Sequence, residues 1–105
     1  MRIPKRFNLK GKAWQVVVET DLKHDDGTEC DGLCDVEGRV IYLDARLRGR
    51  KKKFIFLHEL THALIHEAHI NPGVRFSEGV EEVLCDAFAD LITSSFTNIK
   101  WKKRK

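Results

Sequence analysis

Two histidines and a glutamate lie close together in the run His58-Glu59-Leu60-Thr61-His62. Residues four apart on an α-helix lie one turn above each other on one face, so the two imidazoles could converge on a single metal ion. Imidazole nitrogens bind Zn²⁺ at about 2.0–2.1 Å. Glu59 would point about 100° around the helix from His58 and could accept a proton from water without binding the metal itself. The spacing therefore predicts a metal site that supports hydrolysis.

The apolar residues around this motif favour a metal site over an exposed helical surface. Phe54-Ile55-Phe56-Leu57 precede the motif and Ala63-Leu64-Ile65 follow it, and unpartnered polar side chains in such a setting would be unfavourable. His66 continues the four-residue spacing, but it lies about 12 Å from His58 along the helix axis, which is too far for one shared ion. The metzincin pattern needs a later histidine and glycine at positions that this chain fills with alanine and isoleucine.

A catalytic zinc site needs a third protein ligand, and the segment after residue 77 offers several glutamates. Glu82 stands four residues before Asp86, so both lie on one face of a helix. Asp86 could accept the second ring N–H of a ligating histidine and thereby fix its tautomer. We favour Glu82 as the third ligand, with Glu81 as the alternative, because Glu81 has only Cys85 one turn later. Glu82 lies nearly opposite the apolar stripe of its helix, so this assignment requires that stripe to pack on the sheet or the tail.

Three strands are predicted to precede the metal-binding motif. Ala13–Glu19 is rich in β-branched and aromatic residues and indicates a strand. Gly32–Val36 and Arg39–Asp44 flank Glu37-Gly38, which predicts a hairpin in which Gly38 supplies a positive φ. Strands joined by so tight a turn pair antiparallel.

Two long helices are predicted to follow these strands. The first runs from about Arg50 to Asn71-Pro72-Gly73, where the proline and the glycine end it. The second runs from about Ser77, a plausible N-cap, to Ser95. Its apolar residues form one stripe at helical spacing, at positions 80, 83, 84, 87, 88, 91 and 92. We expect an α+β fold in which a small, mainly antiparallel sheet packs on the two helices.

Length and composition set the broad class of the protein. A chain of 105 residues is the size of one domain, and we assign residues 1–96 to that domain and residues 97–105 to a basic tail. Three cysteines are too few for a disulfide framework. No apolar run approaches the roughly 20 residues that cross a bilayer, and the N-terminus lacks the apolar region of a signal peptide. We expect a cytoplasmic protein without membrane contact.

Charged residues are strongly segregated along the chain. Residues 19–37 carry eight acidic side chains, residues 46–53 carry six basic ones, and residues 100–105 carry five more. Such runs are usually solvated surfaces. No helix-turn-helix, zinc-finger or RNA-binding signature accompanies them. We therefore do not expect nucleic acid to be the main partner.

His24, Cys30 and Cys34 form a second group of metal-binding residue types. Their C-x₃-C spacing fits the common zinc-binding patterns poorly, and only one cysteine pair is present. The aspartates of the same segment do not match an EF-hand loop. We therefore expect one zinc site per chain, and we expect Cys85 to serve packing rather than catalysis.

The stretch Glu82-Val83-Leu84-Cys85-Asp86-Ala87-Phe88-Ala89 resembles the E-x-x-A-[ND]-x-F-A helix of ImmA/IrrE-type metallopeptidases and the matching helix of HtpX-type peptidases. Cys85 replaces the usual alanine. Together with the H-E-x-x-H motif, the chain resembles the gluzincin class of zinc peptidases over about residues 32–96, and its brevity resembles the minigluzincins. By this resemblance His58, His62 and Glu82 would ligate Zn²⁺, Glu59 would be the general base, and Asp86 would orient a ligand histidine.

The resemblance also implies an activity, which is hydrolysis of peptide bonds in a protein or peptide substrate. Zinc would polarise the carbonyl and activate water, and Glu59 would pass a proton to the leaving amine. Zincins usually add a histidine or tyrosine that stabilises the oxyanion, and Tyr42, His66 and His69 are the candidates. A strand of the hairpin would border the cleft and pair with extended substrate.

The resemblance leaves the state of the enzyme open. In minigluzincins the C-terminal segment can lie in the cleft and keep the enzyme latent, and Thr97–Lys105, with Trp101 as an anchor, could do the same. The alternative is a solvated basic tail. The alternative function is a catalytically silent, zinc-containing regulatory or binding module that contacts nucleic acid through its basic patches. The oligomeric state is open.

Overall fold

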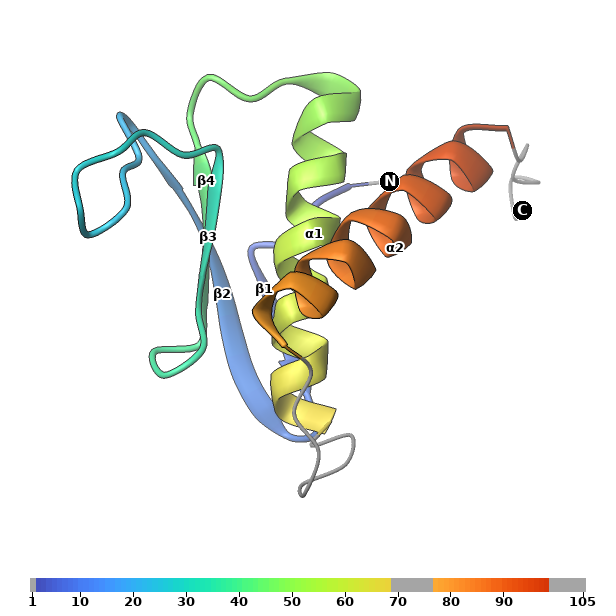
Figure 1. The fold of residues 1–105 in the computed structure, drawn as a ribbon, viewed down its shortest axis with the longest axis horizontal. Helices are drawn as coiled ribbons and strands as arrows, with labels where there is room; N and C mark the ends of the chain where they lie inside the picture. Colours follow the sequence, from blue (N-terminus) through green and yellow to red (C-terminus); the bar gives the residue numbers. More distant parts are fainter. Residues whose placement is uncertain (1, 69–76, 99–105) are drawn as a thin grey trace.

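A computed structural model describes residues 2–68 and 77–98 of the chain, with side chains up to residue 94. Figure 1 shows the fold. Its elements, in chain order, are β1 (Arg6–Leu9), β2 (Lys12–Glu19), β3 (Gly32–Asp35), β4 (Val40–Asp44), α1 (Gly49–Ala68) and α2 (Glu78–Asn98). The predicted α+β fold is confirmed. The expected tail from residue 97 partly overlaps α2, and its part from residue 99 onward lies outside the described residues, as does His69.

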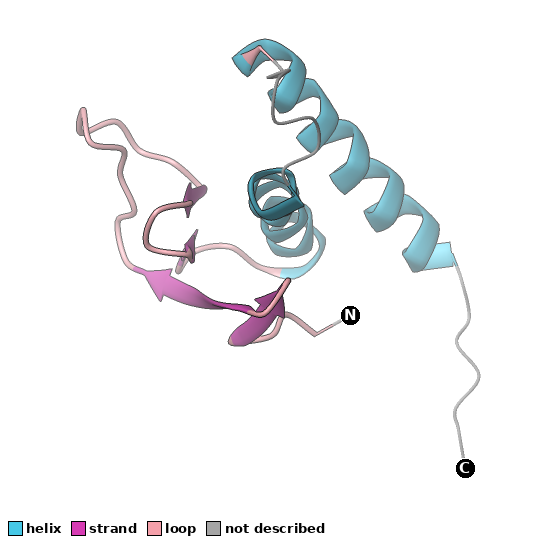
Figure 2. Ribbon diagram, turned by 90° about the horizontal axis from the view of Figure 1, so that it is seen from below, coloured by secondary structure: helices cyan, strands magenta, loops and turns pink. Residues whose placement is uncertain are grey.

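The elements form three layers, with α1 between the sheet and α2 (Figure 2). The four strands lie in the order β1-β2-β4-β3. The β1–β2 and β3–β4 pairs are antiparallel, as in the predicted hairpin, but β2 and β4 are parallel. The sheet is therefore mixed, and β3 lies at one of its edges. The edge formed by β3 borders the candidate site.

Strand β1 was not predicted, although its turn carries a recognisable signal. It joins β2 through Lys10-Gly11, and both residues have positive φ, at 50° and 78°. Two successive positive φ angles define the tight turn that suits the twist of a hairpin. Phe7 of β1 stacks on Trp14, with ring centroids 6.1 Å apart, and meets the edge of Phe56. The short strand thus joins the core.

The hairpin turn between β3 and β4 differs from the prediction in one detail. The positive φ falls on Arg39, at 55°, and not on Gly38. A Cβ at Gly38 would lie 2.5 Å from an Asp35 carboxylate oxygen, so a larger residue there would displace this exposed carboxylate. That carboxylate accepts a hydrogen bond of 3.0 Å from the Gly38 N–H. The Asp35 side chain thus caps the turn.

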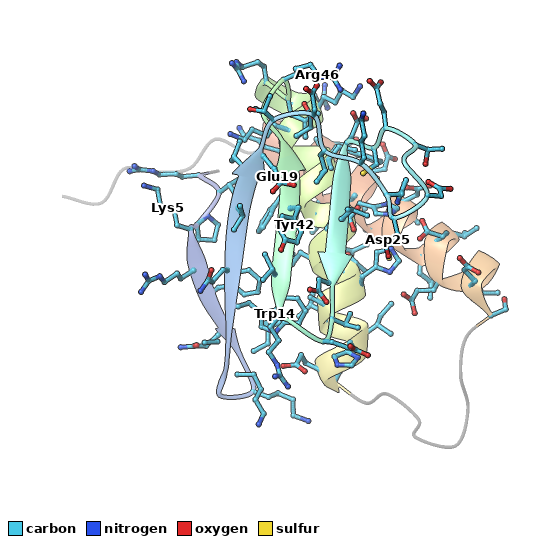
Figure 3. The ribbon with its side chains drawn as sticks, turned by 90° about the vertical axis from the view of Figure 1, so that its left-hand side faces the viewer. Lys5, Trp14, Glu19, Asp25, Tyr42 and Arg46 are labelled. Atoms are coloured by element: carbon cyan, nitrogen blue, oxygen red, sulfur yellow. The ribbon has the colours of Figure 1, made fainter. Side chains whose placement is uncertain are left out.

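The core lies between the sheet and α1. Ile41 and Leu43 of β4 point into it and are fully buried, since alternate residues of a strand face one side. They pack with Phe56 and Leu57 of α1. Tyr42 lies between them in sequence and therefore points to the other face of the sheet, which Figure 3 shows turned away from the helices. Burial of these apolar side chains fixes α1 on the sheet.

The apolar stripe of α2 does not pack on the sheet, which was one of the two surfaces suggested for it, and the tail, the other surface, lies outside the described residues from residue 99 onward. Most of the stripe's large side chains are 39–67% exposed, and they are Val80, Val83, Leu84, Phe88 and Leu91. Ile92 is the exception and packs against the core. The face that meets α1 contains the fully buried Cys85 and Ala89. The sheet is out of reach because α1 already covers it, so α2 packs on α1 (Figure 2). Ser77 caps α2 as predicted, its Oγ accepting a 3.2 Å hydrogen bond from the Val80 N–H.

Within the described residues, neither helix combines the length and the apolar character that crossing a lipid bilayer requires.

Near the end of α1, Glu67 is buried and accepts hydrogen bonds from Trp14 Nε1 at 3.2 Å and from Arg39 Nε at 3.1 Å. Arg39 thereby lowers the pKa of Glu67, and the pair ties the helix end to the sheet.

Asp44, the last residue of β4, joins the sheet to two loops. Its buried carboxylate accepts hydrogen bonds from the Leu22 N–H at 3.1 Å and from the Arg46 N–H at 2.8 Å. The Arg46 guanidinium donates a further bond of 2.9 Å. The Arg46 and Leu22 bonds hold the pKa of Asp44 at about 2, below its ordinary value of 3.8. One carboxylate therefore fixes both the loop after β2 and the connection into α1.

We expect Asp44→Asn to lower the thermal midpoint of unfolding by an amount that depends on pH. Because the folded state lowers the Asp44 pKa from 3.8 to about 2, the charged form stabilises the fold above about pH 4, and this stabilisation is lost as the pH falls toward 2. The gap between wild type and variant should therefore be widest at about pH 6 and should shrink at lower pH. Circular dichroism melts at several pH values measure it. Asp25→Asn, in an exposed loop, is the control, and a gap that stays constant with pH would contradict the role of Asp44.

Candidate metal centre

His58 and His62 of α1 point toward α2, and the Glu82 carboxylate lies between them. Glu82 Oε2 is 3.0 Å from His58 Nε2, and Glu82 Oε1 is 2.9 Å from His62 Nε2. The two imidazoles are 14% and 16% exposed, and the Glu82 side chain is 50% exposed. The structure thus brings together the three side chains that the sequence suggested as ligands. They converge at the α1–α2 interface and are open to solvent on the side of α2.

The other nitrogen of each imidazole also faces a carboxylate. Asp86 Oδ1 lies 2.7 Å from His58 Nδ1, as the spacing of Glu82 and Asp86 suggested. Glu81 Oε2 lies 2.5 Å from His62 Nδ1. Glu81 was considered only as an alternative ligand, and its place beside His62 was missed. Adjacent residues on a helix diverge by about 100°, so Glu81 and Glu82 can reach two nitrogens of one ring from different sides.

This donor set fits a divalent metal ion. A neutral imidazole that donates its Nδ1 proton to a carboxylate has an unprotonated Nε2, whose lone pair here faces a Glu82 oxygen. Two lone pairs about 3 Å apart repel unless a cation lies between them or the ring is protonated. Two imidazoles and one carboxylate are a common zinc ligand set, and carboxylates commonly hold the second nitrogen of zinc-binding histidines.

Cys85 is the other candidate ligand near the two imidazoles. Its sulfur and a ring nitrogen of both His58 and His62 all lie within 4.8 Å of one another. The side chain is fully buried, and burial together with nearby carboxylates, Glu82 foremost, raises the pKa of its thiol to about 12. Glu82 approaches both nitrogens to 3.0 Å or less. Both side chains therefore lie within reach of the two imidazoles, and of the two the Glu82 carboxylate meets both Nε2 atoms at hydrogen-bonding distance while Cys85 is packed between the helices.

Glu59 lies beside this centre without pairing with either imidazole. It is 8% exposed, and its side chain lies against Gly32 of β3. A Cβ at Gly32 would lie 3.1 Å from Glu59 Cγ and 2.6 Å from Ile55 Cγ2, so only glycine allows β3 to approach α1 so closely. Burial raises the pKa of Glu59, while His58 and His62 oppose the shift. The carboxylate is held at the place expected for a general base.

A cleft of about 420 Å³ opens over these residues. Its walls come from β3, from α2 and from the loop after β2, and α1 forms its floor. The lining residues are His24, Gly32, Leu33, Cys34, Val36, His58, Glu59, His62, Glu81 and Glu82. Because β3 pairs only with β4 in the described sheet, its outer edge borders the cleft. A peptide in extended conformation could pair with that edge.

The structure separates two of the other suggested residues, His66 and Tyr42, from this cleft. His66 lies beside Glu67, with His66 Nε2 3.7 Å from a carboxylate oxygen, and Tyr42 lies on the opposite face of the sheet. Cys34 lines the cleft, and burial raises the pKa of its thiol to about 12. Within the described residues, Cys30 and Cys34 join no group that could hold a metal ion. His24 lines the cleft as well, a position that no pattern in the sequence predicted.

The comparison with protein families agrees with this arrangement. Residues 15–90 match the family described as the IrrE N-terminal-like domain, peptidase family M78. The matched range includes α1, β3 and β4 in full and part of β2 and α2, and it contains all the residues of the candidate centre. No curated protein shows significant similarity to the chain. The resemblance to ImmA/IrrE-type peptidases seen in residues 82–89 is confirmed, and the chain belongs to the IrrE N-terminal-like domain family of M78 peptidases.

Proposed function

We propose that this protein is a zinc metallopeptidase in which His58, His62 and Glu82 hold Zn²⁺ and Glu59 is the general base. The observation that carries the proposal is the Glu82 carboxylate within 3.0 Å of both Nε2 atoms, with a carboxylate on each Nδ1. When bound, zinc would supply a Lewis acid that polarises the scissile carbonyl and acidifies water. The match to a peptidase family supports the same reaction.

The protein groups would divide the proton transfers among themselves. Glu59 would accept a proton from the attacking water and deliver it to the nitrogen of the leaving amine. Its burial against Gly32 restricts the carboxylate to one position, which favours transfer over a short, fixed distance. Asp86 and Glu81 would hold the imidazoles in the tautomer that presents Nε2 to the metal.

The substrate we propose is a protein or peptide segment in extended conformation. The free edge of β3 would pair with its backbone, and the apolar side chains of Leu33 and Val36 would contact its residues. Pairing with a strand edge uses the backbone groups of the ligand, so it suits peptides of many sequences and does not suit a small molecule without such a backbone. All three cysteines are free thiols, which supports the proposed cytoplasmic location because that compartment keeps thiols reduced.

Glu59→Gln is the test of the general base. We expect the variant to retain zinc and to lose about 10²–10⁴-fold in the rate of peptide hydrolysis, since the amide cannot accept the proton. Zinc per chain is measured by elemental analysis, and hydrolysis is measured on a library of quenched fluorescent peptides. Glu19→Gln, at the exposed end of β2, is the matched control. Unchanged hydrolysis by Glu59→Gln would rule out the proposed mechanism.

A second set of variants tests the ligand assignment. We expect Glu82→Gln to weaken zinc binding more than the about 10–100-fold that the loss of a carboxylate partner of a ligand histidine causes. Glu81→Gln and Asp86→Asn should fall within that lower range, because each removes only such a partner. Competition with a chromogenic chelator measures all three affinities. A larger loss with Glu81→Gln than with Glu82→Gln would transfer the ligand role to Glu81.

A further inference from the structure

We infer that His24 is a catalytic residue of this site, whose imidazole donates a hydrogen bond to the oxygen of the scissile carbonyl as that oxygen gains negative charge. The inference rests on the proposed peptidase function and adds a residue from outside both helices. Hydrolysis of an amide passes through a tetrahedral oxyanion, and fixed hydrogen-bond donors aimed at this oxygen accelerate the reaction. Such a donor must come from a side chain that lines the cleft.

Few of the residues that line the cleft can donate a hydrogen bond from their side chains. Glu59, Glu81 and Glu82 are carboxylates, and four further lining residues are glycine, aliphatic residues or cysteine. His58 and His62 have both ring nitrogens against carboxylates. No lysine, arginine or tyrosine is among the described lining residues. His24 is therefore the strong donor left, and among the described residues no carboxylate lies within 4.0 Å of its ring nitrogens.

The backbone of His24 is held in place, as a catalytic group requires. Its N–H donates to the Thr28 carbonyl at 2.8 Å, and its own carbonyl accepts from the Gly27 N–H at 2.9 Å. The Asp26 carboxylate closes the same turn by accepting hydrogen bonds from the Thr28 N–H and hydroxyl. The loop is thus a closed turn with internal hydrogen bonds. Its geometry is set before substrate binds, which is the condition for effective electrostatic stabilisation.

The base of this loop is anchored to the core. Leu22 is 2% exposed, its N–H donates to Asp44, and its carbonyl accepts a hydrogen bond of 3.1 Å from the Cys30 N–H. The Asp44 N–H in turn donates to the Asp31 carbonyl at 2.9 Å. The loop leaves β2 and returns to β3, and Figure 2 shows it reaching past the sheet on the side where α2 begins. This placement brings His24 to the wall of the cleft.

The other candidates for this role do not reach the cleft. Tyr42 and His66 lie elsewhere, as described above, and neither lines the cleft. The substrate would run along β3, which begins at Gly32 beside Glu59. A peptide in that position would lie between the general base on α1 and the imidazole on the loop. The two groups could therefore act on the same scissile bond, Glu59 from the floor of the cleft and His24 from its wall.

His24→Ala tests the inference, with His66→Ala as the matched control because His66 is exposed on α1 outside the cleft. We expect His24→Ala to bind zinc as wild type does and to lose about 10²–10³-fold in kcat/KM, mainly in kcat. A peptide phosphoramidate, which carries an anionic oxygen on a tetrahedral centre, should bind the variant more weakly by a similar factor. His24→Gln, which keeps an N–H donor, should recover part of both losses.

The outcomes separate the inference from the proposed function. Wild type that binds zinc but cleaves no peptide would overturn the proposed function, and the inference with it. Active wild type, together with a His24→Ala variant that keeps kcat/KM and phosphoramidate affinity within about threefold, would overturn the inference alone. Equal losses in His24→Ala and His66→Ala would also overturn it, since they would reflect charge or stability rather than contact with the substrate.

Discussion

Crowded carboxylates around two imidazoles are the constraint on which the arrangement of the helices depends. Glu81, Glu82 and Asp86 from α2 meet His58 and His62 from α1, and Glu59 lies buried close by. Two like charges about 4 Å apart repel by about 4 kcal/mol at an effective dielectric constant of about 20. Positive charge near the oxygens, from protonated imidazoles or from a bound cation, lowers this repulsion. Glu82, His58 and His62 are the residues that would hold a divalent cation, which would supply that charge.

The same constraint explains why α2 turns its polar face inward. A helix with a stripe of large apolar residues normally buries that stripe, yet Val83 and Leu91 are 67% and 63% exposed here. The face toward α1 carries the carboxylates together with the small residues Cys85 and Ala89, which allow the helices to lie close. Close approach brings Glu82 within reach of both histidines. Polar contacts with the two imidazoles therefore accompany the orientation of α2, whereas apolar burial holds α1 on the sheet.

The parts of this structure that depend on local spacing could be predicted from the sequence, and those that depend on packing could not. Helical periodicity places His58 and His62 together and Glu82 with Asp86, whichever way the helices cross. The role of Glu81 depends on how α2 lies against α1, which no single-helix pattern contains. His24 is 34 residues before His58 in the chain, and it enters the cleft only because Asp44 holds the loop after β2. Likewise, the parallel pairing of β2 with β4 depends on where β4 enters the sheet after β3, which no local pattern in the sequence determines.

The two helices therefore owe their positions to different forces. Phe56 and Leu57 hold α1 on Ile41 and Leu43, and this packing needs no metal. The contact of α2 with α1 buries mainly the small side chains Cys85 and Ala89 and places three carboxylates near two imidazoles. Binding of the proposed metal ion by residues of both helices would therefore add to the free energy that docks α2. Under the proposed function a single ion would then complete both the fold of the site and its chemistry, because the same carboxylates and imidazoles that hold α2 against α1 would hold the metal.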